Sequence, residues 1–133
     1  DEEKKVWTIP AERMKSRRPH RVPLSETALE VIKAAKGKHS QFVFPAPSHD
    51  GPLSNMALLM LLRRLESSDV TAHGFRSSFR DWAAETTNFP REVAEMALAH
   101  VIESDTEAAY RRGDLFEKRR QLMDAWGAFA SST

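Results

Sequence analysis

The chain contains no cysteine, so disulfide bonds and thiolate metal sites are excluded within it. No apolar run approaches the roughly 20 residues that a membrane-spanning helix needs, and no signal-peptide pattern opens the sequence. Neither sign of charge dominates, because the net charge is only +1, so any attraction to nucleic acid must come from a local patch. The 133 residues are 41% apolar and 29% charged, which is typical of one folded domain. A location in the cytoplasm is expected.

The first structured segment that the sequence predicts is a hairpin with a basic tip. Val6–Ile9 is rich in β-branched and aromatic residues and predicts a short strand, and Arg21–Leu24 predicts its antiparallel partner. From Glu12 to Arg21, five basic residues stand against one acid, a local balance of 5 − 1 = +4; they are Arg13, Lys15, Arg17, Arg18 and Arg21. Such a tip suits a phosphate backbone, although a solvated basic loop is an equally good interpretation.

Helical patterns cover most of the remaining chain. Ser25 is a favourable N-cap for a helix to about Lys36, and Pro90 suits the first turn of a helix to Leu98. A helix over 54–66, capped by Ser54, is apolar around most of its circumference and is expected at the centre of the core. Another helix over 75–86 should direct one arc inward: Phe75, Phe79, Trp82 and Ala83.

Two further helices are expected toward the end of the chain. A short one starts near Ser104 and carries Tyr110, and the last one is opened by a capping box at Asp114 and Glu117. Residues 41–44 predict a short strand or an extended segment. The fold class is therefore α+β, mainly helical, with a small antiparallel sheet near the N-terminus.

Four polar residues in the second half of the chain form a set suited to phosphate chemistry without a metal: His73, Arg76, His100 and Tyr110, which is the only tyrosine. Each has a plainer interpretation when taken alone. A histidine at a helix start near an arginine is common, and a histidine at a helix C-terminus is often only a favourable partner of the helix dipole. From the residues alone, the prediction is a helical domain with a basic hairpin and no assigned function.

Five stretches, in this order and at these spacings, resemble the catalytic domain of tyrosine recombinases, the phage integrase family, and are most similar to the integrases of prophages and genomic islands. They are residues 7–15, residues 18–25, His73-Gly74-Phe75-Arg76, Leu98-Ala99-His100 and residues 108–112. The resemblance implies that residues 1–133 are a C-terminal catalytic domain of that fold type. It also implies a piece of a longer protein, without the upstream DNA-binding domains and without the family's first catalytic arginine.

The resemblance assigns a role to each residue of the set. Tyr110 is the expected nucleophile, Arg76 the second of the family's two arginines, and His73 the candidate base. His100 is an added donor, and Lys15 is the expected general acid, although neighbouring basic residues of the same turn are alternatives. The remaining basic residues of the hairpin are the candidate DNA contacts: Arg13, Arg17, Arg18 and Arg21. No metal and no cofactor is expected.

The activity implied is site-specific recombination, in which a DNA strand is cut and rejoined through a 3′-phosphotyrosine. The expected partners are double-stranded DNA at attachment sites and further protomers in a synaptic tetramer, docked through the helix of residues 114–130 with Trp126 and Phe129 as anchors. No membrane partner is expected, and the location is the bacterial cytoplasm at the nucleoid. Alternatives are a DNA-binding or regulatory fragment without catalysis, and a DNA-relaxing topoisomerase with the same chemistry.

Overall fold

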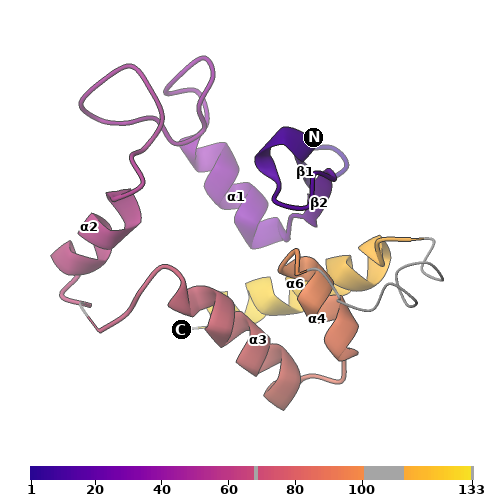
Figure 1. The fold of residues 1–133 in the computed structure, drawn as a ribbon. Coiled ribbons are helices and arrows are strands. Elements are labelled where there is room, and N and C mark those ends of the chain that lie inside the picture. Colours follow the sequence, from indigo (N-terminus) through magenta and orange to yellow (C-terminus); the bar gives the residue numbers. More distant parts are fainter. Residues whose placement is uncertain (68, 101–112, 133) are drawn as a thin grey trace. The chain divides into compact units, whose positions relative to one another are not determined.

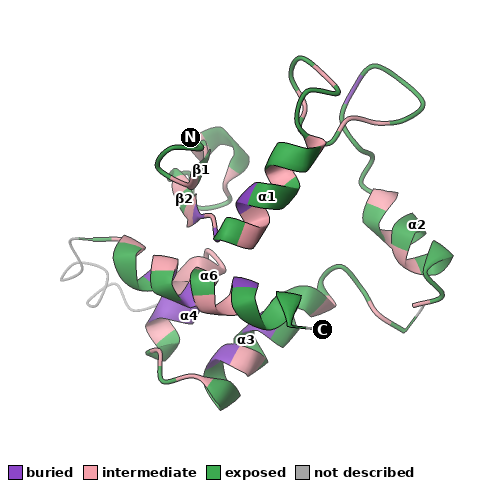
Figure 2. Ribbon diagram, turned by 180° about the vertical axis from the view of Figure 1, so that it is seen from behind, coloured by how far each residue is buried: buried purple, intermediate pink, exposed green. Residues whose placement is uncertain are grey.

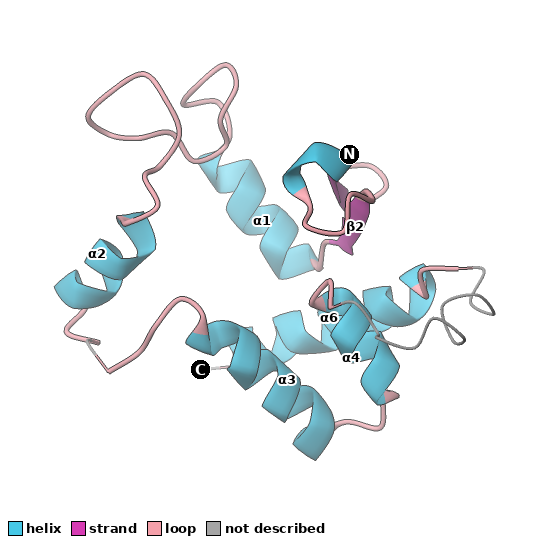
Figure 3. Ribbon diagram, viewed as in Figure 1, coloured by secondary structure: helices cyan, strands magenta, loops and turns pink. Residues whose placement is uncertain are grey.

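The computed structural model describes residues 1–67, 69–100 and 113–132 (Figure 1). Helices predominate among them, and the only sheet in these ranges is a two-stranded antiparallel hairpin (Figure 3). The mainly helical α+β class is therefore confirmed. The chain divides into two compact units, one of residues 1–29 with 79–133 and one of residues 30–78, and each is described by itself below.

The N-terminal hairpin opens the first unit. Strand β1 (Val6–Ile9) pairs with β2 (His20–Pro23), with Val6 opposite Pro23 and Ile9 opposite His20. A short 3₁₀ helix, η1 (Ala11–Arg13), follows β1 and leads into the turn. Both predicted strands are thus confirmed, and the second begins one residue earlier than its sequence pattern indicates.

Among the described residues of the first unit, three helices contribute to its core. They are α3 (Gly74–Thr86), of which the part from Phe79 belongs here, α4 (Arg91–Ala97) and α6 (Phe116–Ser131). The buried apolar residues at their contacts are Phe79, Ala83, Val93, Ala94 and Leu122. Figure 2 draws the buried segments of the ribbon in purple. The predicted helices over 75–86 and 90–98 are confirmed to within a residue or two. In the predicted arc of α3, Phe79 and Ala83 are buried, whereas Phe75 is 54% exposed.

The start of α1 (Glu26–Ala35) lies against α6 in the same unit. The Ser25 hydroxyl accepts a hydrogen bond from the amide of Ala28, which confirms the predicted N-cap. Gly127 of α6 faces this cap so closely that a Cβ atom there would lie 2.6 Å from the Ser25 hydroxyl oxygen. A glycine at this position therefore allows the two helices to approach.

Residues 30–78 form the second unit and correct three predictions. Helix α2 (Ala57–Arg64) contains no buried residue, so it is not central to a core. It begins after Met56 without a side-chain cap, so Ser54 does not cap it. Residues 41–44 form no strand, and the amides of Gln41 and Phe42 donate instead to Nδ1 of His39. The nearest pairing is a single bridge between Pro45 and Pro52.

The start of α6 also differs from its prediction. The residue before the helix is Leu115, in a left-handed conformation with φ 51°, and no side chain caps the helix. Asp114 and Glu117 therefore form no capping box, because the Asp114 carboxylate is used by two arginines instead. None of the helices in the described ranges is long and apolar enough to cross a membrane.

Candidate active site

Lys15 lies in the turn between the two strands, as predicted. The turn follows η1 and is exposed, and Arg17 within it has a left-handed backbone with φ 55°. Arg13, Arg17 and Arg18 are exposed beside Lys15. The hairpin therefore presents a group of cations to solvent within the first unit, where a polyanion can reach them.

His73 and Arg76 lie at the start of α3, in the second unit. The Thr71 hydroxyl accepts a hydrogen bond of 3.0 Å from the amide of Gly74 and so caps this helix, a role that the sequence analysis did not assign. The carbonyl of His73 accepts the amide of Arg76 at 3.0 Å. Both predicted residues thus belong to a helix N-terminus, where the helix dipole favours a negative ligand.

His100 follows α4 and is held by Glu95 of that helix. Ala99 takes a left-handed conformation with φ 56°, the Ala99 amide bonds the carbonyl of Met96 at 3.1 Å, and the His100 amide bonds the carbonyl of Glu95 at 2.9 Å. These two bonds define a Schellman motif. The Nδ1 atom of His100 also lies 2.5 Å from Oε2 of Glu95.

The Glu95 carboxylate was not predicted to belong to the site. Its other oxygen accepts a hydrogen bond of 2.9 Å from Nε of Arg80 on α3. The hydrogen bond from His100 is the main reason that the pKa of Glu95 lies below its usual value, and Arg80 adds to this effect while partial burial opposes it. The only available sequence signal was the position of an acid five residues before a histidine, which is too common to be specific.

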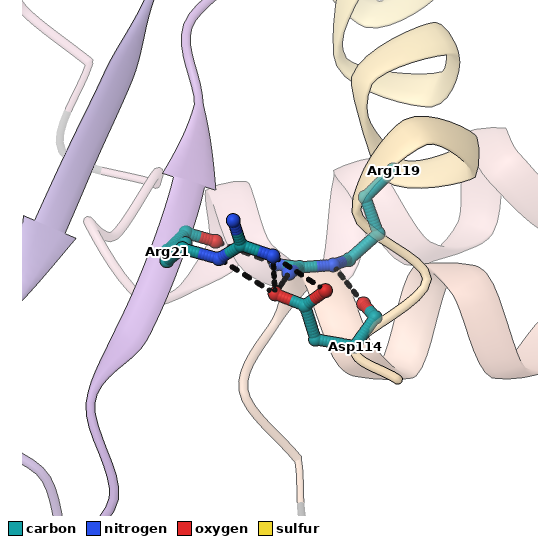
Figure 4. Close-up of polar contacts among 3 residues, drawn as sticks. All are labelled: Arg21, Asp114 and Arg119. Atoms are coloured by element: carbon teal, nitrogen blue, oxygen red, sulfur yellow. Dashed lines mark hydrogen bonds and ion pairs between the residues drawn. The ribbon is translucent and has the colours of Figure 1, made fainter. Parts of the chain in front are cut away.

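A second unpredicted feature joins the hairpin to α6 (Figure 4). The Arg119 side chain is only 1% exposed and donates to the carbonyls of Arg21 and Asp114 at 2.6 and 2.7 Å and to the Asp114 carboxylate at 2.9 Å. The Arg21 guanidinium bonds the same carboxylate at 2.8–3.0 Å. We call these three residues the Arg21–Asp114–Arg119 clamp.

The charges of the clamp determine the protonation of the carboxyl group at its centre. Desolvation raises the pKa of Asp114, but the hydrogen bond from Arg21 and the charges of both arginines outweigh it, so the pKa lies below its usual value. Arg21 was predicted as a DNA contact, and its guanidinium is engaged here. Its contact with DNA stays a prediction.

His20 links the hairpin to the end of α4. Burial and the charge of Arg119 lower the pKa of His20, and a hydrogen bond to the backbone of Ala97 acts in the opposite direction. The imidazole of His20, on the strand that leads out of the basic turn, therefore lies near the end of α4.

The five residues of the predicted set are divided among the two units and the residues outside the described ranges. Lys15 and His100 belong to the first unit, and His73 and Arg76 to the second. Tyr110 lies outside the described residues. The gathering of these five residues around one phosphate therefore stays a prediction.

Comparison with known proteins gives the family. The model of the phage integrase family matches residues 1–115, and the chain belongs to this family. It is 37% identical to prophage integrase IntA of Escherichia coli strain K12 over 124 residues, 90% of this chain and 30% of IntA. It is also 37% identical to prophage integrase IntZ of the same strain over 119 residues, 87% of this chain and 29% of IntZ, and 28% identical to the integrase of Shigella phage Sf6 over 131 residues, 95% of this chain and 34% of that protein.

The chain therefore spans about a third of the length of these curated relatives. No solved structure matches it.

Proposed function

We propose that residues 1–133 are the C-terminal catalytic domain of a longer tyrosine recombinase, which integrates or excises a mobile element at a specific DNA site. The observation that carries the proposal is the presence of Lys15, the His73–Arg76 pair, His100 and Tyr110, in this order, in a chain of the phage integrase family. The relatives' threefold greater length supports a larger parent protein. Its substrate is double-stranded DNA at attachment sites, in the bacterial cytoplasm.

The chemistry proceeds through a covalent intermediate. The Tyr110 oxygen attacks the scissile phosphorus, the bond to the 5′-oxygen breaks, and a 3′-phosphotyrosine forms. Attack benefits from a group that accepts the phenolic proton, and His73 takes that role. The phosphotyrosine ester replaces the phosphodiester that was broken, so a 5′-hydroxyl of another strand can attack its phosphorus, form a new phosphodiester and release the Tyr110 oxygen, which regains a proton.

The cationic residues stabilise the charge that develops on the phosphate oxygens. Arg76 suits this task because a guanidinium binds two oxygens and keeps its charge, and His100 is an added donor. Removal of one such donor typically costs about 10²–10³ in rate. Lys15 protonates the departing 5′-oxygen, and the exposed Arg13, Arg17 and Arg18 hold the hairpin against the DNA backbone.

The test is a suicide substrate that traps the covalent adduct on the full-length parent. Tyr110→Phe is expected to abolish the adduct, because it removes the attacking oxygen, while DNA binding remains and weakens with rising salt. A DNA-binding module without catalysis gives binding but no adduct even with tyrosine in place. An adduct that persists in Tyr110→Phe contradicts the assignment of the nucleophile.

We propose in addition that the helix α6 docks on a second protomer when the recombinase assembles into a synaptic tetramer. Phe129 packs on Trp126 and Trp82 of its own chain but is still 53% exposed, which supports its role as an anchor. Trp126 is half-buried against Phe79 and Trp82 of its own chain, so it contributes less free surface than its place near the helix end indicates. Sedimentation of the DNA-bound parent tests this: Phe129→Ser should lower the assembly state, and an unchanged tetramer contradicts the proposal.

A further inference from the structure

Glu95, on α4, uses its carboxylate to contact His100, which is one of the predicted site residues. Its side chain is only 14% exposed, and its two oxygens are used separately. Oε1 accepts the Nε–H of Arg80 at 2.9 Å, and Oε2 lies 2.5 Å from Nδ1 of His100. Arg91, on the same helix, lies farther away, with its Nε 3.6 Å from Oε1.

We propose that Glu95 is a positioning residue that fixes both the orientation and the tautomer of His100 for its contact with the DNA phosphate. This inference rests on the proposed function, in which His100 donates to the phosphate. Glu95 itself touches no reacting atom in this proposal and acts only through the imidazole.

Glu95 holds His100 at two points. Its backbone carbonyl accepts the His100 amide at 2.9 Å, and its carboxylate binds the imidazole of the same residue. The left-handed Ala99 turns the chain back over α4, which brings both contacts onto one residue. A histidine fixed by backbone and side chain together loses little further freedom when it meets a ligand, so its contact is preorganised.

The hydrogen-bonding capacity of the Glu95 carboxylate determines the tautomer of His100. A carboxylate only accepts hydrogen bonds, so Nδ1 of His100 must carry the proton that it shares with Glu95. The guanidinium of Arg80 only donates, so it keeps the carboxylate in place without competing for that proton. Nε2 then lies on the opposite side of the ring from Glu95. When Nε2 is also protonated, the cationic ring donates through it to a phosphate oxygen.

Glu95→Gln separates this mechanism from a purely structural contact. The amide is almost isosteric with the carboxylate, but it has one accepting oxygen and one donating NH₂ group. Because Arg80 can only donate, the oxygen is expected to face Arg80. The NH₂ group then faces Nδ1 of His100, which must become the acceptor. The neutral ring is therefore expected to change from the Nδ1–H form to the Nε2–H form.

The first measurement is the tautomer itself, read from the ¹⁵N shifts of the His100 ring in the 133-residue chain at a pH where the ring is neutral. The expected result is Nδ1–H with Glu95 and Nε2–H in Glu95→Gln. The matched control is Glu85→Gln, which changes an exposed acid of α3 and should leave the tautomer unchanged. Should Glu95→Gln fail to fold, the unaltered chain still decides, since an Nε2–H ring there overturns the proposal.

The second measurement is the rate of adduct formation by the full-length parent. Glu95→Gln is expected to lower this rate about 10- to 100-fold, the usual cost of losing a group that orients a functional histidine. In a His100→Ala background the same change should cost less than about threefold, because Glu95 acts through His100. Equal losses in both backgrounds overturn the positioning role. The absence of an adduct with the unaltered parent instead counts against the proposed function, so the two failures are distinguishable.

Discussion

Ala99 is a residue whose backbone conformation conflicts with its side chain. Its φ of 56° is in the left-handed region, which costs an L-residue about 1–2 kcal/mol and costs glycine almost nothing. Glycine also has more conformational entropy in the unfolded chain, and this offsets roughly 0.5–1 kcal/mol of the stability gained by relieving the left-handed conformation. Ala99→Gly is therefore expected to raise the free energy of unfolding by about 0.5–1 kcal/mol, measured by urea denaturation.

The control for Ala99→Gly is the same substitution in the middle of a helix. Ala84 is exposed in α3 and has no need of a left-handed conformation, so Ala84→Gly should lower the free energy of unfolding by about 1 kcal/mol. Opposite signs for the two variants support the C-cap geometry that turns the chain from α4 toward His100. A loss of stability in both contradicts it.

At the scale of elements, the contact between the hairpin and α6 depends on Arg119. Its guanidinium satisfies the carbonyls of Arg21 and Asp114 while almost completely buried. Arg119→Met keeps much of the apolar stem but leaves these acceptors without a donor, so we expect a loss of about 2–4 kcal/mol in the free energy of unfolding. Chemical denaturation monitored by tryptophan fluorescence measures it.

The neighbouring arginine on the same helix is the matched control. The side-chain hydrogen bonds of Arg120 within the described residues are long, at 3.4–3.5 Å, and go to the carbonyl of Lys4 and to the exposed Glu117, while its guanidinium carbon lies 4.9 Å from the centroid of the Phe116 ring. Arg120→Met should therefore cost less than about 1 kcal/mol. Similar losses in the Arg119 and Arg120 variants argue that the clamp contributes no more than an ordinary surface charge.

Some of the helices and strands could be predicted from the sequence, and others could not. The strands of the hairpin and helices α3 and α4 were predictable because each depends on local signals, namely β-branched alternation, an apolar arc and a proline at the first turn. The supposed capping box at Asp114 failed because a tertiary contact, 93 residues away at Arg21, takes the carboxylate. Glu95 was not predicted for the same reason, because its place in the site depends on a contact with Arg80 of another helix.

For the whole molecule, three lowered pKa values predict how stability depends on pH. His20, Glu95 and Asp114 each bind protons less readily in the folded chain than in the unfolded one. The unfolded state therefore takes up more protons as the pH falls, and stability decreases. The loss due to His20 begins below about pH 6.5 and continues through its lowered folded pKa, and the losses due to Glu95 and Asp114 begin as the pH falls through about 4.5 and about 4.

The His20 contribution is separable by mutation. The difference in the free energy of unfolding between the unaltered chain and His20→Gln should be constant above about pH 7 and shrink as the pH falls from 6.5 to 5, because only the unaltered chain loses the benefit of a neutral imidazole. Urea denaturation at several pH values measures it. A difference that grows with acid contradicts the direction of the shift.

The contact between the hairpin and α6 joins residues far apart in the sequence, and this has a consequence for folding during synthesis. Arg21 finds Asp114 and Arg119 only across 93 and 98 positions of sequence, with residues 30–78 belonging to a different compact unit. A chain that emerges from the ribosome in order must carry its basic hairpin without that support until translation has passed the clamp. Because contacts between residues so far apart in sequence close slowly, the docking of the hairpin on α6 is expected to be a late step of folding.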